Sequence, residues 1–209
     1  MNICAEVHQL FNLLPHHHFP FSDKIIPLNG IYILFEAGEL AHDTYRIVRI
    51  GTHNGDGNLP SRLKSHFIKE NKDRSIFRKN IGRAILNKVN DSFLEQWDLD
   101  LTSREAKDNL LNKINLEKQK QIERQVTEYI QKNFWFVLFP VEKREDRLFW
   151  ESRIISTVSR CNDCRPSEKW LGLHSPKDKI RESGLWIVNE LYKQPLSADE
   201  FDQLKKIVF

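Results

Sequence analysis

Two runs of alternating apolar residues, joined by a short polar segment, restrict most strongly how this chain of 209 residues can fold. In the first run, GIYILFE at 30–36, the two-residue period places Ile31, Ile33 and Phe35 on one face of a strand and Tyr32 on the opposite face. The segment AGELAHD that follows is short and polar. We therefore expect a hairpin of two antiparallel strands.

The second run, TYRIVRIGTH, has the same period. It places Arg46, Val48 and Ile50 on one face and Arg49 and His53 on the other.

The next two segments indicate a loop and then a helix. HNGDGNLP has the Gly, Asn and Pro residues typical of a loop. In SRLKSHF, Arg62 and His66 are four residues apart, which places a permanent cation and a titratable imidazole on one helical face. The phenol of Tyr32 can therefore meet both groups.

An apolar run without alternation, FWFVLF at 134–139, predicts a central strand buried on both faces and ended by Pro140. The helix after it is expected to turn Phe149 and Ile154 toward the core and to place Glu151 at the rim. A carboxylate there is costly unless it is paired or binds a metal.

These motifs, in this order along the chain, resemble the GIY-YIG nuclease family. The resemblance covers roughly residues 28–160 and rests on the following residues: Gly30-Ile31-Tyr32, then Arg49-Ile50-Gly51 where that family has its YIG, then Arg62 and His66, and then Glu151. One position departs from the family pattern, because Arg49 stands where the first tyrosine of YIG is expected.

The resemblance implies a one-metal hydrolysis of phosphodiester bonds. Glu151 would hold Mg²⁺ or Mn²⁺, and Arg62 and His66 would act on the phosphate. Tyr32 would orient or activate the attacking water, with a pKa lowered from about 10 by neighbouring cations. Arg49 cannot act as a base, but it would depress the pKa of the phenol or bind a phosphate oxygen. Without the resemblance, Glu151 would be read as a surface residue paired with Arg147 or Arg153.

The implied fold class is α+β, with a small central antiparallel sheet flanked by helices, a helical insertion and a C-terminal elaboration. We expect the following division of the chain: an N-terminal arm at 1–27 that packs on the domain, a GIY-YIG-like domain at 28–165 with its insertion at about 71–132, and an extension at 166–209 that completes the domain.

The leading hypothesis is a metal-dependent endonuclease that acts on DNA, with RNA as a further substrate class. A nucleic-acid-binding module that has kept the fold and lost catalysis is the alternative, motivated by Arg49 and by the absence of a clear Asn ligand after Glu151. A structural or assembly protein built on a long helix at 103–132 is a third reading, and it would not require the residues of the motif.

Charge also favours a polyanionic partner. The net charge is only +3, but the segment 62–88 holds nine Lys and Arg residues against two acidic ones. A charged solvated surface is the alternative reading of such a segment. The residues expected to bind nucleic acid are His53, Lys64, Arg74, Arg78, Lys79 and Arg83.

No apolar stretch approaches the roughly 20 residues of a membrane span, and the N-terminus lacks the pattern of a signal peptide. The chain has only three cysteines, a sparse set that fits a reducing compartment. We therefore expect a cytoplasmic protein with no membrane partner. Oligomeric state is left open.

Two other patterns lead to weaker expectations. Cys161 and Cys164 have the spacing of half a zinc site, but there is no second C-x-x-C and His174 would be only a third ligand, so free thiols are favoured. Thr102 and Glu105 have the form of a capping box, which predicts the start of a long helix.

Overall fold

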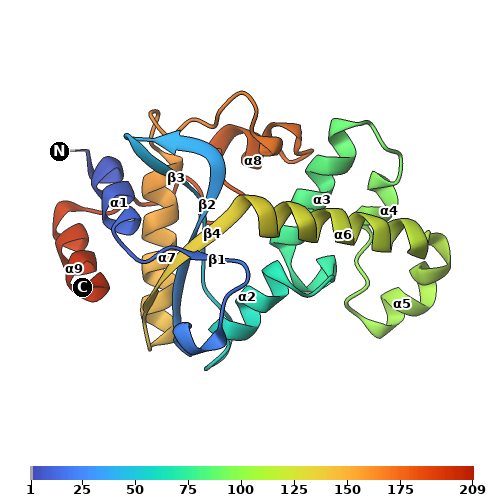
Figure 1. The fold of residues 1–209 in the computed structure, drawn as a ribbon, viewed down its shortest axis with the longest axis horizontal. Helices are drawn as coiled ribbons and strands as arrows, with labels where there is room; N and C mark the ends of the chain where they lie inside the picture. Colours follow the sequence, from blue (N-terminus) through green and yellow to red (C-terminus); the bar gives the residue numbers. More distant parts are fainter. Residues whose placement is uncertain (1) are drawn as a thin grey trace.

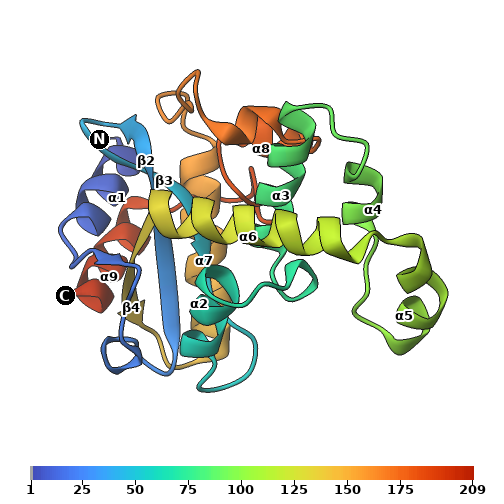
Figure 2. The same cartoon turned by 45° about the vertical axis from the view of Figure 1, so that its right-hand side comes forward.

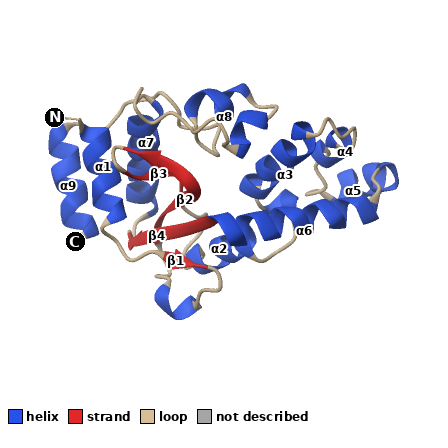
Figure 3. Cartoon of the chain, turned by 45° about the horizontal axis from the view of Figure 1, so that its top comes forward, coloured by secondary structure: helices blue, strands red, loops and turns tan. Residues whose placement is uncertain are grey.

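The fold is α+β, as expected, in a computed structural model that describes residues 2–209. A four-stranded antiparallel sheet has the strand order β1-β4-β2-β3 and is covered by helices on both faces (Figures 1 and 3). The strands are β1 (His17–His18), β2 (Gly30–Ala41), β3 (Thr44–Gly51) and β4 (Phe134–Pro140).

Each face of the sheet has its own hydrophobic core. One face is covered by α1 (Ile3–Asn12), α7 (Arg144–Ser159) and α9 (Ala198–Val208). The other face is covered by α2 (Leu59–Phe67), α3 (Ile76–Lys88), α6 (Leu116–Asn133) and α8 (Asp178–Ser183). No helix within residues 2–209 is both long and apolar enough to cross a membrane.

The predicted hairpin is confirmed. Strands β2 and β3 pair antiparallel and are joined by His42 and Asp43. Both turn residues have positive φ, 52° and 58°, as in the type I′ turn that matches the twist of paired strands. The alternation in β2 is also confirmed, because Ile31 and Ile33 enter one core and Tyr32 enters the other.

The alternation expected in β3 is wrong at one point. Residue Leu34 of β2 lies opposite Arg49, whereas the next residue, Phe35, lies opposite Ile47. This shift is a β-bulge, which adds one residue to a strand and reverses the facing of those beyond it. Val48 and Ile50 therefore enter different cores instead of sharing a face. Arg49, opposite Leu34, lies on the face of Tyr32, and the extra residue Val48 faces the same side.

The central strand is confirmed as β4, which pairs with β2 on one side and β1 on the other. Its residues alternate between the two cores, with Phe134 and Phe136 in one and Val137 and Phe139 in the other. An uninterrupted apolar run is thus explained by burial on both faces.

The long helix expected from Thr102 is interrupted. Ser103, not Thr102, caps α5 (Arg104–Leu110), and Asn115 caps α6 after a short break. Together with α4 (Leu94–Asp98), these helices project from the end of the molecule farthest from the chain termini (Figures 1 and 2). Four short 3₁₀ segments complete the described elements: η1 (Asp23–Ile25), η2 (Lys72–Arg74), η3 (Leu111–Lys113) and η4 (Leu171–His174).

Helix α7 also differs from expectation. Ile154 enters the core as predicted, but Phe149 is 40% exposed and Trp150, at 5% exposure, takes the core position. Since the two neighbouring aromatic residues differ mainly in burial, they provide a matched test.

We expect Trp150→Ala to reduce the free energy of unfolding by about 3–5 kcal/mol, because it empties a packed core position. Phe149→Ala should cost less than about 1 kcal/mol, as is usual for surface substitutions. Urea denaturation of both variants measures the difference. Equal losses would contradict this orientation of α7.

Candidate active site

A groove lies where the loop after β3 meets α2 and α7. Its larger part has a volume of about 770 Å³, and the adjoining part has about 420 Å³. The two parts share Arg62, Leu148 and Glu151 in their linings. Arg62 comes from α2, on one face of the sheet, whereas Glu151 comes from α7, on the other. They meet because β3 is an edge strand, so that side chains from both faces reach past it.

Glu151 is held at the end of β3 by the backbone N–H of Thr52, which donates to Oε1 over 3.1 Å. Burial raises the pKa of Glu151, while the positive charge of Arg49 and this hydrogen bond act in the opposite direction. The alternative salt bridges are not formed: Arg147 lies 3.9 Å from Asp56, and Arg153 lies 3.1 Å from Glu200. The carboxylate therefore faces the groove without an ion-pair partner among residues 2–209.

A chain of hydrogen bonds runs beneath the groove. The hydroxyl of Tyr32 lies 2.7 Å from Nε2 of His66, and Nδ1 of His66 lies 2.7 Å from Oγ of Ser75. Burial lowers the pKa of His66 well below 6.5, and the charges of Arg62, Arg49 and Arg78 lower it further. A neutral imidazole donates through one nitrogen and accepts through the other. His66 therefore couples the two hydroxyl groups.

Arg49 links this chain to the groove. Its Nε donates to the Tyr32 hydroxyl over 3.5 Å, and Nη1 donates to the carbonyl of Trp186. Its guanidinium also lies over the ring of Phe77, 5.3 Å from the centroid. The adjacent Gly51 is required by sterics, because a Cβ there would lie 2.3 Å from the Tyr32 oxygen.

The five residues expected around the reaction centre thus form two layers. Arg49, Arg62 and Glu151 line the groove. Tyr32 and His66 are completely buried beneath it, where the phenol meets the imidazole as expected.

The basic segment is positioned differently from the expectation. Arg74 lines the groove, but Arg78, Lys79 and Arg83 are buried. Each of these three is engaged within the chain: Arg78 pairs with Glu123 over 2.7 Å, Lys79 with Asp73 over 3.6 Å, and Arg83 with Asp98 over 2.6 Å. The expectation that these three bind nucleic acid is therefore wrong, because their charges are buried against acidic residues of the chain.

Of the two other expected contacts, His53 lies in the loop before α2 and Lys64 lies on α2 itself. His53 lines the groove and is buried, and its Nε2 accepts the backbone N–H of Gly30 over 3.3 Å. Burial and then the charge of Arg147 lower the pKa of His53. Lys64 is half-buried and pairs with Asp23.

Sequence reasoning missed several residues that build the site. Ser75 is the N-cap of α3, a role that its position before a helix could have indicated, but nothing local connects it to His66. Thr52 contributes a backbone N–H, and Trp186 a backbone carbonyl, which side-chain chemistry does not indicate. Lys69 joins Arg74 in the lining.

The lowered pKa of His66 predicts a dependence of stability on pH. Below about pH 6.5 the unfolded ring gains a proton that the folded ring does not bind. The free energy of unfolding therefore decreases as the pH is lowered. We expect the urea midpoint to fall less between about pH 7.5 and pH 5.5 in His66→Gln than in the wild type. Equal falls in the two proteins would show that His66 does not cause the acid sensitivity.

Comparison with known proteins identifies the family. The family model described as GIY-YIG domain matches residues 19–209, nearly the whole chain. Neither the curated proteins nor the solved structures yield a match. The matched region contains the groove and the Tyr32, His66 and Glu151 positions beneath and around it. The chain therefore belongs to the GIY-YIG family of nucleases.

Proposed function

We propose that the protein is a metal-dependent endonuclease that hydrolyses phosphodiester bonds in DNA, with RNA as a further substrate. The observation that carries the proposal is the meeting of Glu151 with Arg49 and Arg62 in one groove. A carboxylate opposite two guanidinium groups offers one site for a cation and another for a phosphate.

Glu151 is the residue that would hold Mg²⁺ or Mn²⁺. Its burial favours partnership with a positive charge, and the Thr52 N–H fixes only one of its oxygens. Carboxylate oxygen is a preferred ligand of these hard ions. When bound, the metal supplies charge neutralisation at the phosphate and assistance to the leaving oxygen.

Arg62 is suited to bind the phosphate. Its Nη1 donates to the backbone carbonyl of Arg74 over 3.3 Å, and it makes no ion pair within residues 2–209. A guanidinium presents a fork of donors that matches phosphate oxygens. Its remaining donors can thus face a substrate in the groove.

Tyr32 and His66 act from their buried positions beneath the groove. We assign to Tyr32 the orientation or activation of the attacking water, and to His66 the holding of the phenol proton at Nε2. Because Tyr32 is completely buried, direct contact with water requires the Arg49 side chain to move. A phosphate competing for the Arg49 guanidinium supplies a reason for that movement.

The first prediction separates catalysis from binding through Glu151. Glu151→Gln keeps the size of the side chain and removes the charge that would hold the metal, so cleavage should fall by roughly 100-fold or more. Binding measured in EDTA should be unchanged or tighter, because a negative charge near phosphate is lost. The measurement is a gel cleavage assay with Mg²⁺ or Mn²⁺ beside a binding assay, on duplex, branched and single-stranded DNA.

Arg62→Ala serves as the comparison, since it should weaken both cleavage and binding. If the wild type binds these substrates and cuts none of them with either metal, the noncatalytic binding module replaces the endonuclease. If Glu151→Gln cuts at the wild-type rate, the metal assignment is wrong.

The second prediction concerns the basic residues of the groove wall. Lys69→Gln combined with Arg74→Gln should weaken binding about equally across sequences. It should also flatten the slope of log affinity against log salt by roughly one unit per lost contact. Lys206→Gln, at an exposed position of α9, is the control and should leave the slope unchanged. An unchanged slope in the double variant would place the nucleic acid elsewhere.

A further inference from the structure

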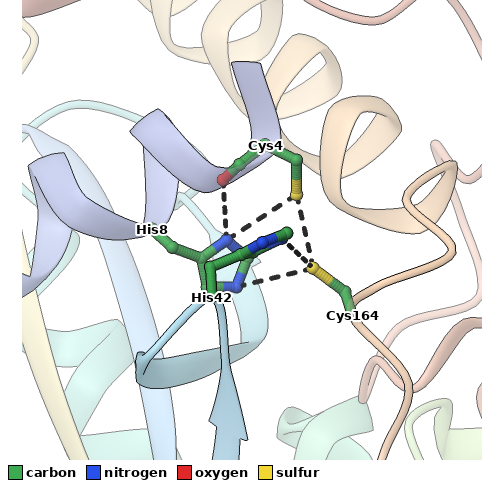
Figure 4. A group of neighbouring side chains, drawn as sticks. All are labelled: Cys4, His8, His42 and Cys164. Carbon is green, nitrogen blue, oxygen red and sulfur yellow. Dashed lines mark hydrogen bonds between the residues drawn. The ribbon is translucent and has the colours of Figure 1, made fainter. Parts of the chain in front are cut away.

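All three cysteines of the chain gather at one place, at the end of β3 opposite to the groove. Cys4 comes from α1, His42 from the turn between β2 and β3, and Cys161 and Cys164 from the loop after α7. Figure 4 shows the side chains of Cys4, His42 and Cys164 directed toward one another, with His8 of α1 beside them. The cluster shares no residue with the candidate active site.

The distances in the cluster suit one metal ion. Sγ of Cys4 lies 3.3 Å from Sγ of Cys164, and Nε2 of His42 lies 3.2 Å from the same sulfur. Ligand atoms of a tetrahedral zinc site lie roughly 3.4–3.8 Å apart, given Zn–S and Zn–N distances of about 2.3 and 2.0–2.1 Å. One potential ligand atom from each of Cys4, His8, His42 and Cys164 lies within 4.8 Å of the others.

His8 and Cys161 are the two candidates for the fourth ligand of the ion, beside Cys4, His42 and Cys164. His8 is completely buried, and both of its nitrogens have backbone partners: Nδ1 lies 2.9 Å from the carbonyl of Cys4, and Nε2 accepts the N–H of Ile47 over 3.2 Å. The lone pair that a metal would need is therefore already used. His8 is better suited to orient the cluster than to bind the ion.

Cys161 is free of this conflict. Its sulfur lies 3.5 Å from Nε2 of His42. The N–H of Cys164 donates to the carbonyl of Cys161 over 3.4 Å, which closes a turn within the C-x-x-C segment. The thiolate is the form of cysteine that binds metals.

The chemistry of these donors selects the metal. Thiolate sulfur and imidazole nitrogen favour Zn²⁺ over Mg²⁺ or Ca²⁺, which prefer oxygen. Cys4 and Cys164 are both buried, and thiolates in a buried site would require a positive counter-charge, which a metal ion supplies.

We propose that Cys4, His42, Cys161 and Cys164 bind one structural Zn²⁺ and that His8 orients the site without binding the ion. Four protein ligands close the coordination sphere, as in structural rather than catalytic zinc sites. The ion joins three segments that are distant in the sequence: α1, the β2–β3 turn and the loop after α7. The proposal does not depend on nuclease activity.

The first experiment uses the untagged wild-type chain, purified under reducing conditions and dialysed against buffer with and without Zn²⁺. We expect about one zinc per chain by elemental analysis, and a first shell of three sulfurs and one nitrogen by X-ray absorption. Replacement by Co²⁺ should produce thiolate charge-transfer absorption and tetrahedral d–d bands. Less than stoichiometric zinc after dialysis with Zn²⁺, or a Cys4–Cys164 disulfide in its place, would overturn the proposal.

The second experiment compares Cys164→Ser and Cys161→Ser with His8→Asn, and uses His18→Asn as the control because His18 is an exposed histidine outside the cluster. Both cysteine variants should lose most of the bound zinc, whereas His8→Asn should retain it with weaker affinity, and His18→Asn should match the wild type. EDTA should lower the Tm of the wild type and of His18→Asn, but not of Cys164→Ser.

Retention of zinc in Cys164→Ser would overturn the site. Loss of zinc in His8→Asn with retention in Cys161→Ser would overturn the assignment of the fourth ligand. If the cysteine variants do not fold, the Co²⁺ spectrum and the EDTA-dependent Tm of the wild type still decide the proposal.

Discussion

The pairing of Arg49 with Leu34 places its guanidinium on the face of Tyr32, beside the groove. There it lies against the Tyr32 hydroxyl and lines the groove with Glu151. The β-bulge follows at once toward the turn, and its extra residue, Val48, faces the same side as Arg49. Bulges often occur near functional sites.

The C-terminal segment is part of the same arrangement. The carbonyl of Trp186 accepts a hydrogen bond from Arg49, while its indole donates to Glu36 over 2.8 Å. Trp170 donates to the same carboxylate oxygen over 2.7 Å. Burial raises the pKa of Glu36, and these hydrogen bonds lower it. The C-terminal segment therefore holds the arginine of the motif while its indoles attach to a buried acid of β2.

The two proposed metal positions lie at opposite ends of β3 and differ in chemistry. Glu151, an oxygen ligand, is bonded to Thr52 just after the strand, whereas His42 precedes it and lies among thiols. The Glu151 position fits a hard ion whose coordination sphere stays open to substrate. The cluster around His42 fits a softer ion that is fully coordinated by the protein. The hairpin would then be anchored at its turn while its other end remains open to nucleic acid.

The sequence by itself determined the elements whose signals are local. Four such signals depend only on neighbouring residues, and the structure contains each of them: the period of two at 31–35, the apolar run of β4, the loop before α2, and the spacing of Arg62 and His66. The family motif added the placement of Glu151 near Arg62, which no local period could provide.

Only the tertiary structure decided the bulge at Arg49, the burial of Arg78 against Glu123, and the meeting of Cys4 and His42 with Cys164. The excess of Lys and Arg in a segment does not reveal which of these side chains pair with a distant acid, because that depends on how the helices pack. Cys4 and His42 are each more than a hundred residues from Cys164, so apart from the C-x-x-C pair the spacing of the cluster carries no pattern. Long-range packing, not local propensity, brings such groups together.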